Sequence, residues 1–351
     1  MQVAHKINNE LNFAFNNMFS PVNKYETHDD ALENLLIRMK LISAKGKRLR
    51  GALVYYSYLL YSGKDIEEIL KASVFVELMH THILMMDDII DEDEKRRGHP
   101  TLHKFFMDEH VRNGLKKNAR HFGESMAICA SLMLSYATQN VFLNTNFSAD
   151  IKIKALDNYF HKLLLTGYGE ILDVLSEVKN KVSIDEAMKI NLFKTAIYTY
   201  ESPLHLGAIL AGATTKDLTL LSEYSIPIGI AFQIKDDILG MFGDEKKLGK
   251  PVGSDLREGK MNILTIYTLE HSSVKDRKIF SNLLGNKNIT IDDIDTARRI
   301  IKSSGALEYA QNLISQYSKK AMSSLNKIES QNDSAKKFLE WIIEYTVNRK
   351  Y

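Results

Sequence analysis

The stretch ILKASVFVELMHTHILMMDDIIDEDEKRR, residues 69–97, is the most informative part of the chain. Its first two thirds are apolar on nearly every face of a helix, which is typical of a central helix rather than a peripheral one. It then becomes acidic and finally basic. We expect one helix from about Ile69 to Arg97, ended by the segment Gly98-His99-Pro100.

Two acidic segments lie within apolar, helix-like stretches. In the first, Asp87 and Asp91 lie one turn apart on one face with Asp88 beside them, and His80 lies two turns earlier. The second segment is Asp236-Asp237-Ile-Leu-Gly240. A buried carboxylate costs several kcal/mol unless a cation or proton compensates it. The two segments therefore predict a site for hard divalent cations, with Mg²⁺ shared with a phosphate-bearing substrate as the best match.

The composition predicts an all-α, single-domain protein over residues 1–351. The chain is 44% hydrophobic and 26% charged, and its five prolines are too few to interrupt the three- and four-residue apolar spacing.

A net charge of +2 argues against a general nucleic-acid binder. The single cysteine, Cys129, fits a reducing compartment. The N-terminus has no signal pattern, and no run approaches about 18 continuous apolar residues, so we expect a cytoplasmic protein without a transmembrane segment.

Acids that open an amphipathic helix are a different case from the two segments above. We interpret Asp29-Asp30 and Asp292-Asp293-Ile-Asp295 as helix N-termini, where carboxylates accept from free backbone N–H groups.

Two basic clusters are candidates for anion binding. Lys95-Arg96-Arg97 follows the first acids, and a guanidinium matches a pair of phosphate oxygens. In Gly46-Lys47-Arg48-Leu49-Arg50, a helix beginning at about Gly46 would put Lys47 and Arg50 on one face and add free N–H groups. Each cluster also has a simpler interpretation, as charge complementing a helix end or as a basic surface turn.

The second acidic segment has polar neighbours of its own. Gln233 lies one turn before the acids, and a glycine-punctuated loop containing Lys250 and Lys260 follows them, as in a flap that closes over an anion. A solvated charged loop is the alternative. Lys194 and Thr195 stand together in another helical stretch, where surface exposure is the alternative.

In this combination and order, the chain resembles the trans-isoprenyl diphosphate (polyprenyl) synthases over nearly its whole length, and within them the geranylgeranyl diphosphate synthases. Gly46 to Arg50 is similar to the family's GKxxR diphosphate motif, with His80 as its companion. Asp87, Asp88 and Asp91 with Arg96-Arg97-Gly98 resemble the first aspartate-rich motif. Gly169-Glu170-Ile-Leu-Asp173 is similar to GQxxD, Lys194-Thr195-Ala196 to KTA, and Phe232-Gln233 with Asp236-Asp237 to the second aspartate-rich motif. Lys250 and Lys260 fall where the flap lysines fall.

Four positions depart from the family pattern. Gly240 replaces the third aspartate of the second motif, Glu170 replaces glutamine, Gly51 replaces a proline, and Met86 replaces a common histidine. Gly240 matters most, because it leaves only Asp236 and Asp237 at that motif.

The resemblance implies an isoprenoid-synthase-type helical bundle around a central cavity, and a prenyltransferase of isoprenoid biosynthesis. Three Mg²⁺ ions are implied, held by Asp87, Asp88, Asp91, Asp236 and Asp237. The implied catalytic group adds Arg96, Lys194, Thr195, Gln233 and Lys250. The implied substrates are isopentenyl diphosphate and an allylic diphosphate (dimethylallyl, geranyl or farnesyl). The residues implied to bind isopentenyl diphosphate are Gly46, Lys47, Arg50, His80, Arg97 and Lys260. A homodimer is also implied, for which the stretch 122–137 could supply an interface helix or equally core.

In this family, the length of the product depends on the side chains that line the cavity along the first acidic helix, from the acids toward the N-terminus of that helix. One isoprene unit is close to one helical turn of about 5.4 Å. His82 and Ile83, one turn before Asp87, are not bulky aromatics, and the motif has no two-residue insertion. The residues that limit the length of the product are therefore expected further toward the N-terminus of this helix, at Met79 and Phe75. Either side chain could instead simply belong to the hydrophobic core. This favours a twenty-carbon or somewhat longer product over a fifteen-carbon one.

Two other protein classes fit part of the pattern. A class I terpene cyclase shares the all-α fold and Mg²⁺ but does not need Lys47, Arg50 and His80 for a second diphosphate. A non-catalytic subunit of a heteromeric synthase would usually lose the acids that this chain keeps, and only Gly240 favours it.

Overall fold

The computed structural model describes residues 2–19, 30–44, 46–96, 98–179, 181–243, 252–330 and 332–349, with side chains from residue 33 onward in the second range. These residues are helical apart from turns and one two-residue hairpin, which confirms the all-α prediction. Contacts divide the chain into two compact units, Met1–Tyr58 with Gly63–Lys152 and Leu59–Ser62 with Ile153–Tyr351. We call them the N-terminal and C-terminal units. The single-domain interpretation stays a prediction.

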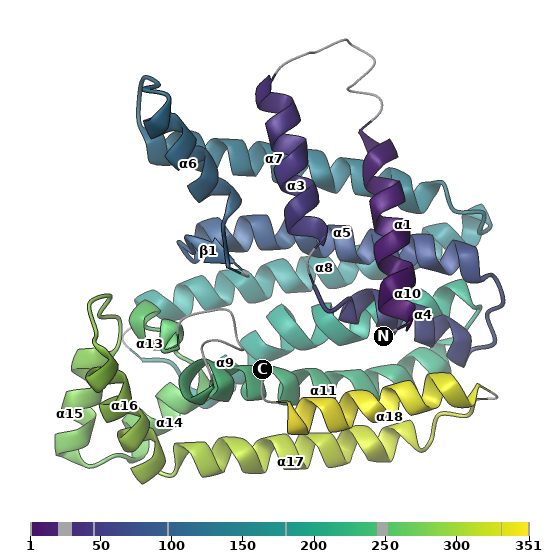
Figure 1. Ribbon diagram of the computed structural model, residues 1–351. Coiled ribbons are helices and arrows are strands. Elements are labelled where there is room, and N and C mark those ends of the chain that lie inside the picture. The colour runs from purple at the N-terminus through teal and green to yellow at the C-terminus, as the bar shows by residue number, and fades with distance from the viewer. Residues whose placement is uncertain are drawn as a thin grey trace. The chain divides into compact units, whose positions relative to one another are not determined.

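The N-terminal unit is built around two long helices that pack along one another, with shorter helices across them (Figure 1). Its elements are α1 (Gln2–Met18), α3 (Asp30–Ala44), α4 (Leu49–Leu60), α5 (Ile66–Ile90), β1 (Lys95–Arg96), β2 (His99–Pro100), α6 (Leu102–Arg112) and α7 (Ala119–Leu143). Helix α5 packs against α7, and α1 contacts both. The buried side chains between them come from every one of these helices except α4, for example Leu11, Met39, Val74, Phe106 and Leu134.

Helix α5 ends earlier than the sequence predicted. It stops at Ile90, and the chain continues through the hairpin in which Lys95 pairs with Pro100. Glu92 takes a left-handed conformation (φ 53°), Asp93 N–H donates to Asp88 O, and Glu92 N–H donates to Ile89 O, which together form a Schellman cap. The negative end of the helix dipole repels a run of carboxylates, which gives the early stop a physical reason.

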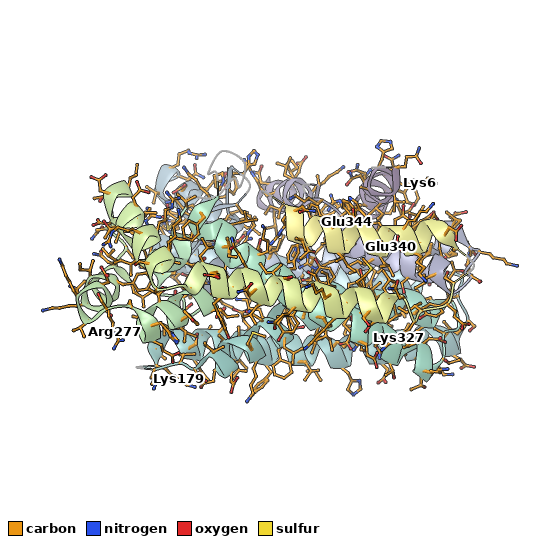
Figure 2. All side chains as sticks on the ribbon, turned by 90° about the horizontal axis from the view of Figure 1, so that it is seen from below. Lys6, Lys179, Arg277, Lys327, Glu340 and Glu344 are labelled. Atoms are coloured by element: carbon orange, nitrogen blue, oxygen red, sulfur yellow. The ribbon has the colours of Figure 1, made fainter. Side chains whose placement is uncertain are left out.

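The C-terminal unit is centred on one helix, α11 (Thr215–Phe242), which carries the second acidic segment. The other elements are α8 (Ala149–Val178, from residue 153), α9 (Ile184–Ile190), the π-helix η1 (Asn191–Glu201), α10 (Ser202–Leu210), α13 (Ser254–Glu258), α14 (Ile263–His271), α15 (Val274–Leu283), α16 (Ile291–Ser303), α17 (Ala306–Leu325) and α18 (Asp333–Asn348). Helices α11, α17 and α18 lie side by side (Figure 1). The π-helix η1 packs on α11. The charged side chains of Lys179, Arg277 and Lys327 lie on the outside of this unit (Figure 2).

Two glycines bring α8 and α11 close to η1. A Cβ at Gly169 would lie 2.5 Å from Lys194 N, and one at Gly229 would lie 2.5 Å from Ala196 Cα. Any larger residue would push η1 away, so the two glycines fix the position of the helix that carries Lys194 and Thr195. A π-helical stretch is uncommon and is often found at functional sites.

The structure also bears on the acids interpreted as helix N-termini. Helix α16 begins at Ile291, and Asp293 forms a capping box with Thr290, so that interpretation of residues 292–295 is confirmed. Asp29 and the side chain of Asp30 lie outside the described residues.

Two helices, α5 and α7, are long and apolar enough to cross a membrane by length and composition. Both are weak evidence, because a core helix of a soluble protein passes the same test, and most of the apolar window of α5 is buried.

Candidate active site

The first acidic segment is held by one arginine of the hairpin. Arg96 Nε donates to Asp88 Oδ1, and its Nη2 lies 3.1 Å from Asp87 Oδ2 and 3.3 Å from Asp93 Oδ2. The sequence placed Arg96 on the helix, but it reaches back to the helix from β1. A single guanidinium thus collects three carboxylates at the C-terminal end of α5.

Asp88 is the buried member of this group. Its residue is 3% exposed, and burial raises the pKa of its carboxyl to about 6, although the charge of Arg96 opposes that rise. A positive charge beside this carboxyl, such as that of Arg96 or of a bound cation, favours its ionised form.

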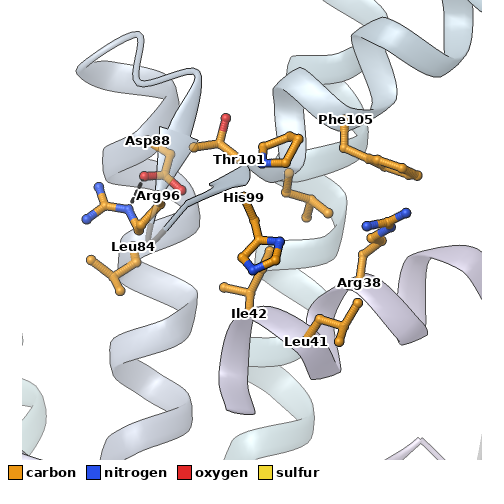
Figure 3. Close-up of a pocket in the computed structure, with 11 residues that line it drawn as sticks. Arg38, Leu41, Ile42, Leu84, Asp88, Arg96, His99, Thr101 and Phe105 are labelled. Atoms are coloured by element: carbon orange, nitrogen blue, oxygen red, sulfur yellow. Dashed lines mark hydrogen bonds and ion pairs between the residues drawn. The ribbon is translucent and has the colours of Figure 1, made fainter. Parts of the chain in front are cut away.

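A mostly apolar pocket of about 70 Å³ borders Asp88 and Arg96 (Figure 3). Leu84, Ile42 and Leu102 line it, and it lies wholly in the N-terminal unit. The guanidinium of Arg38 stacks 3.8 Å from the ring centre of Phe105 at its other end.

The basic segment 46–51 is split between a structural and an exposed part. Helix α4 begins at Leu49, not at about Gly46 as predicted, because Arg48 takes a left-handed conformation (φ 55°). Arg48 is buried, and its Nη1 lies 3.3 Å from Glu77 Oε2. Lys47 is exposed and Arg50 half-buried. Sequence reasoning missed Arg48, whose only signal was its place in a basic string.

Gly51 has a direct structural reason. Its N–H donates to Glu77 Oε1 at 2.8 Å, and a Cβ there would lie 3.1 Å from both Glu77 Cγ and Ile7 Cδ1. A proline would lose that donor, so the departure at this position goes with the buried Arg48–Glu77 pair.

The second acidic segment is oriented by a chain of side chains. Thr195 Oγ1 donates to Gln233 Oε1 at 2.7 Å, and Gln233 Nε2 donates to Asp237 Oδ1 at 2.8 Å. The other carboxylate oxygen of Asp237, Oδ2, is buried and has no hydrogen-bond partner within the described part of the chain. Burial raises the pKa of Asp237 well above its usual value, and the charges of Asp255, Asp236 and Asp173 act in the same direction.

Lys194 is held by both acids of the 169–173 segment. Its Nζ lies 2.9 Å from Glu170 Oε2 and 2.8 Å from Asp173 Oδ2. Glu170, which stands in place of the glutamine of the GQxxD motif, thus forms an ion pair with the lysine.

Asp236 is paired with the end of the chain. Arg349 Nη2 lies 2.5 Å from Asp236 Oδ1 and donates to Phe232 O at 2.9 Å, and its guanidinium stacks on the Phe232 ring at 3.7 Å. Arg349 is buried. No sequence signal linked these positions.

Comparison with known proteins now decides the family. The polyprenyl synthetase family model matches residues 34–301. The chain belongs to the polyprenyl synthetase family. It is 36% identical to a geranylgeranyl diphosphate synthase of Sulfolobus acidocaldarius, covering 88% of this chain and 89% of that protein. It is also 36% identical to a short chain isoprenyl diphosphate synthase of Methanocaldococcus jannaschii, over 82% and 80% of the two chains.

Solved structures agree with this assignment. The geranylgeranyl pyrophosphate synthase of Corynebacterium glutamicum, crystallised with isoprenyl diphosphate and magnesium, superposes with a TM-score of 0.91 at 28% identity over 99% of both chains. The Caulobacter crescentus polyprenyl synthase, crystallised with calcium and isoprenyl diphosphate, gives 0.80 at 25% identity over 100% of this chain and 97% of that one. The protein is therefore a trans-prenyltransferase with an all-α isoprenoid-synthase fold, and the family uses divalent metal.

The remaining residues predicted for this polyprenyl synthetase fall into three groups. Arg97 and Lys250 lie outside the described residues. Lys260 Nζ lies 3.5 Å from Glu258 Oε2, and His80 is half-buried on α5. Asp91 is the C-cap of α5, so it ends the helix rather than lying within it.

The four residues predicted to set chain length lie along α5. Phe75 is fully buried, with its ring 5.0 Å from that of Phe142, and Met79 is 3% exposed. His82 Nδ1 is 2.6 Å from Ser131 Oγ on α7, and Ile83 is half-buried. Phe75 is thus part of the packing between α5 and α7.

The residues fit a magnesium ion that is completed by its substrate. Within the described ranges, no group of three or more acids or histidines is placed to hold a metal by itself. Mg²⁺ commonly takes one or two carboxylates and fills its other positions with water and phosphate oxygens. The buried carboxyl of Asp88 is one such oxygen ligand, and Oδ2 of Asp237, which has no partner among the described residues, is another.

Proposed function

We propose that this prenyltransferase condenses isopentenyl diphosphate with an allylic diphosphate and extends the chain to geranylgeranyl diphosphate. The observation that carries the proposal is Asp237, whose carboxylate is buried, aligned by Gln233 and Thr195, and left with one oxygen that has no partner among the residues the structure describes. Such a group is costly in an enzyme that does not bind a cation there. The geranylgeranyl diphosphate synthases at 30–36% identity support the product class.

The acids would hold the metal. Asp87, Asp88 and Asp91 at one segment, and Asp236 and Asp237 at the other, supply hard oxygen ligands, and we propose three Mg²⁺ ions when substrate is bound. When bound, Mg²⁺ neutralises the diphosphate and stabilises it as a leaving group.

Basic side chains would share the charge of the two diphosphates. Lys194, Lys250 and Arg96 are assigned to the leaving diphosphate, and Lys194 is already positioned by Glu170 and Asp173. Isopentenyl diphosphate is assigned to Gly46, Lys47, Arg50, His80, Arg97 and Lys260.

The chemistry then follows from positioning. The allylic C–O bond breaks with its electron pair leaving on the diphosphate, and the double bond of isopentenyl diphosphate forms the new C–C bond. The released diphosphate takes the proton that is lost. The protein contributes alignment and exclusion of water rather than a nucleophile.

Product length would be set along α5 below Asp87. Ile83, one turn before Asp87, is not a bulky aromatic, and Met79 is the next side chain on that line. Phe75 packs against Phe142, so we assign to Met79 the role of limiting the length of the product.

The enzyme is proposed to act as a cytoplasmic homodimer. Helix α8 exposes a row of apolar side chains at three- and four-residue spacing, Leu164, Tyr168, Ile171, Leu175 and Val178. Helix α7 contains the stretch 122–137 first suggested as an interface, and it exposes Ile128, Leu132 and Tyr136 but buries Leu134. Exposed apolar rows of this kind mark association surfaces.

Product analysis tests the proposal. Purified enzyme is incubated with isopentenyl diphosphate and, in turn, dimethylallyl, geranyl and farnesyl diphosphate, and the products are separated by chromatography. A twenty-carbon product is expected. A twenty-five-carbon product would instead match the geranylfarnesyl diphosphate synthase of Aeropyrum pernix, which is 31% identical. Failure to consume isopentenyl diphosphate would favour the terpene cyclase or non-catalytic alternatives.

A further inference from the structure

The two acidic segments differ at their last position. The first reads Asp-Asp-Ile-Ile-Asp and the second Asp-Asp-Ile-Leu-Gly, so Gly240 stands where the first segment has Asp91. A Cβ added at Gly240 would meet Asp255 first, 3.6 Å from its Oδ2 and 3.9 Å from its Oδ1. The carboxylate of Asp255 therefore borders the space that a side chain at position 240 would occupy.

Asp255 is fixed in this place by its own surroundings. Gly253 N–H donates to Gly240 O at 2.9 Å, which ties the start of α13 to α11. Asn262 Nδ2 donates to Asp255 Oδ2 at 3.1 Å, and Lys260 N–H donates to Asp255 O at 2.9 Å. The first of these hydrogen bonds joins the segment 253–262 to α11, and the other two lie within that segment.

The neighbouring carboxylate supplies a second, independent observation. Asp237 is 5% exposed, and its Oδ2 has no hydrogen-bond partner among the residues that the structure describes. Asp237 and Gly240 are three residues apart on α11, so Asp237 shares one face of that helix with the position that Asp255 borders. Acids gathered around an unpaired buried oxygen are stable together when a cation lies between them.

We propose that Asp255 is a third carboxylate of the magnesium site at the second acidic segment and replaces the side chain that Gly240 lacks. The inference rests on the proposed function, because it assigns one more residue to the same metal. Asp255 acts on Mg²⁺ directly or through one of the waters that Mg²⁺ retains.

Metal binding, measured without turnover, tests the assignment. Mg²⁺ is titrated calorimetrically into the enzyme saturated with inorganic diphosphate. The variant Asp255→Asn keeps the shape and the oxygen that accepts from Asn262 but removes the charge, and we expect its Mg²⁺ affinity to fall about tenfold, within the range known for lost metal-site partners. Glu223→Gln, an exposed change of equal charge early in the same helix α11, should stay within about twofold of wild type.

A compensating variant makes the test specific to this site. A Cβ at position 240 makes only ordinary contacts with the described residues, so we expect Gly240→Asp to fold. Gly240→Asp combined with Asp255→Asn should bring Mg²⁺ affinity back to within about threefold of wild type. If Asp255→Asn does not fold, recovery in the double variant supports the proposal and its failure overturns it.

The outcomes separate the two proposals. Wild-type affinity in folded Asp255→Asn overturns the role of Asp255 and leaves the proposed function standing. Absence of Mg²⁺ binding by the wild-type enzyme with diphosphate overturns both.

Discussion

Arg349, at the C-terminal end of α18, is paired with Asp236, one of the two acids of the second segment. The guanidinium lies 2.5 Å from the carboxylate and 3.7 Å from the ring of Phe232, so the side chain is held on two sides. The pairing ties the C-cap of α18 to α11 and places a positive charge beside a residue assigned to metal binding.

Replacing Arg349 should separate these two effects. Arg349→Ala is expected to lower the free energy of unfolding by about 1–3 kcal/mol, because a charged hydrogen bond and a cation–π contact are lost. It should also lower the Mg²⁺ concentration for half-maximal activity, about threefold, because Asp236 no longer shares its charge with arginine. Thermal melts and Mg²⁺ titrations of activity measure the two quantities.

The matched control is Arg349→Lys, which keeps the positive charge but loses the planar fork. Its melting temperature should be lower than that of wild type, and its Mg²⁺ requirement should change less than that of Arg349→Ala. An unchanged Mg²⁺ requirement in a folded Arg349→Ala enzyme would show that the pair has no bearing on the metal.

Thr195 should act through Gln233 rather than on substrate. Thr195→Val removes the hydroxyl that donates to Gln233 and leaves the amide free to turn away from Asp237. We expect turnover or Mg²⁺ affinity to fall about 10- to 100-fold, as for other outer partners of metal ligands. Thr195→Ser restores the donor and should stay within about threefold. Equal kinetics of the valine and serine variants would disprove the positioning role.

The raised pKa of Asp88 predicts a pH effect on stability. Because its pKa is about 6 in the folded protein and near 4 when unfolded, the native state holds a proton between these values that the unfolded state has released. This group's contribution to stability therefore falls as pH rises from about 4 to 6, and levels off above.

The variant Asp88→Asn isolates that contribution in metal-free enzyme. Relative to wild type it should gain stability as pH rises from about 4 to 7, and the gain should disappear when Mg²⁺ and diphosphate are added to the wild-type protein. Melting curves across this pH range provide the measurement. A difference between the two proteins that does not change with pH would contradict the assigned environment of Asp88.

Product length should respond to Ile83 and not to Phe75. Ile83→Phe puts an aromatic ring one turn below the acids and should shorten the main product from twenty to fifteen carbons, as seen by chromatography. Phe75→Ala removes packing against Phe142 and should cost about 3–5 kcal/mol of stability without lengthening the product. Longer products from Phe75→Ala would show that Phe75, and not Met79, limits the length of the product.

The sequence predicted those parts of the site that depend on local order. The spacing of Asp87 and Asp88, and of Gln233 and Asp237, is a property of one helix, so it could be read without a structure. The end of α5 was misplaced because a left-handed Glu92 has no glycine or proline to mark it.

Contacts between residues far apart in the sequence were out of reach. Arg48 with Glu77 and Arg349 with Asp236 are pairs brought together by packing, and no periodicity within a single chain reports them. Asp255 was passed over for the same reason, since its place beside Gly240 depends on how α13 returns to α11.

The most direct test of the account uses Asp237, on which the proposed metal site depends. Incorporation of labelled isopentenyl diphosphate into a twenty-carbon product is measured for wild type and Asp237→Asn, each with Mg²⁺ and with excess chelator. The account predicts rapid incorporation only by wild type with Mg²⁺, and a loss of at least about 100-fold in the variant. Undiminished elongation by Asp237→Asn, or by wild type stripped of divalent metal, would contradict it.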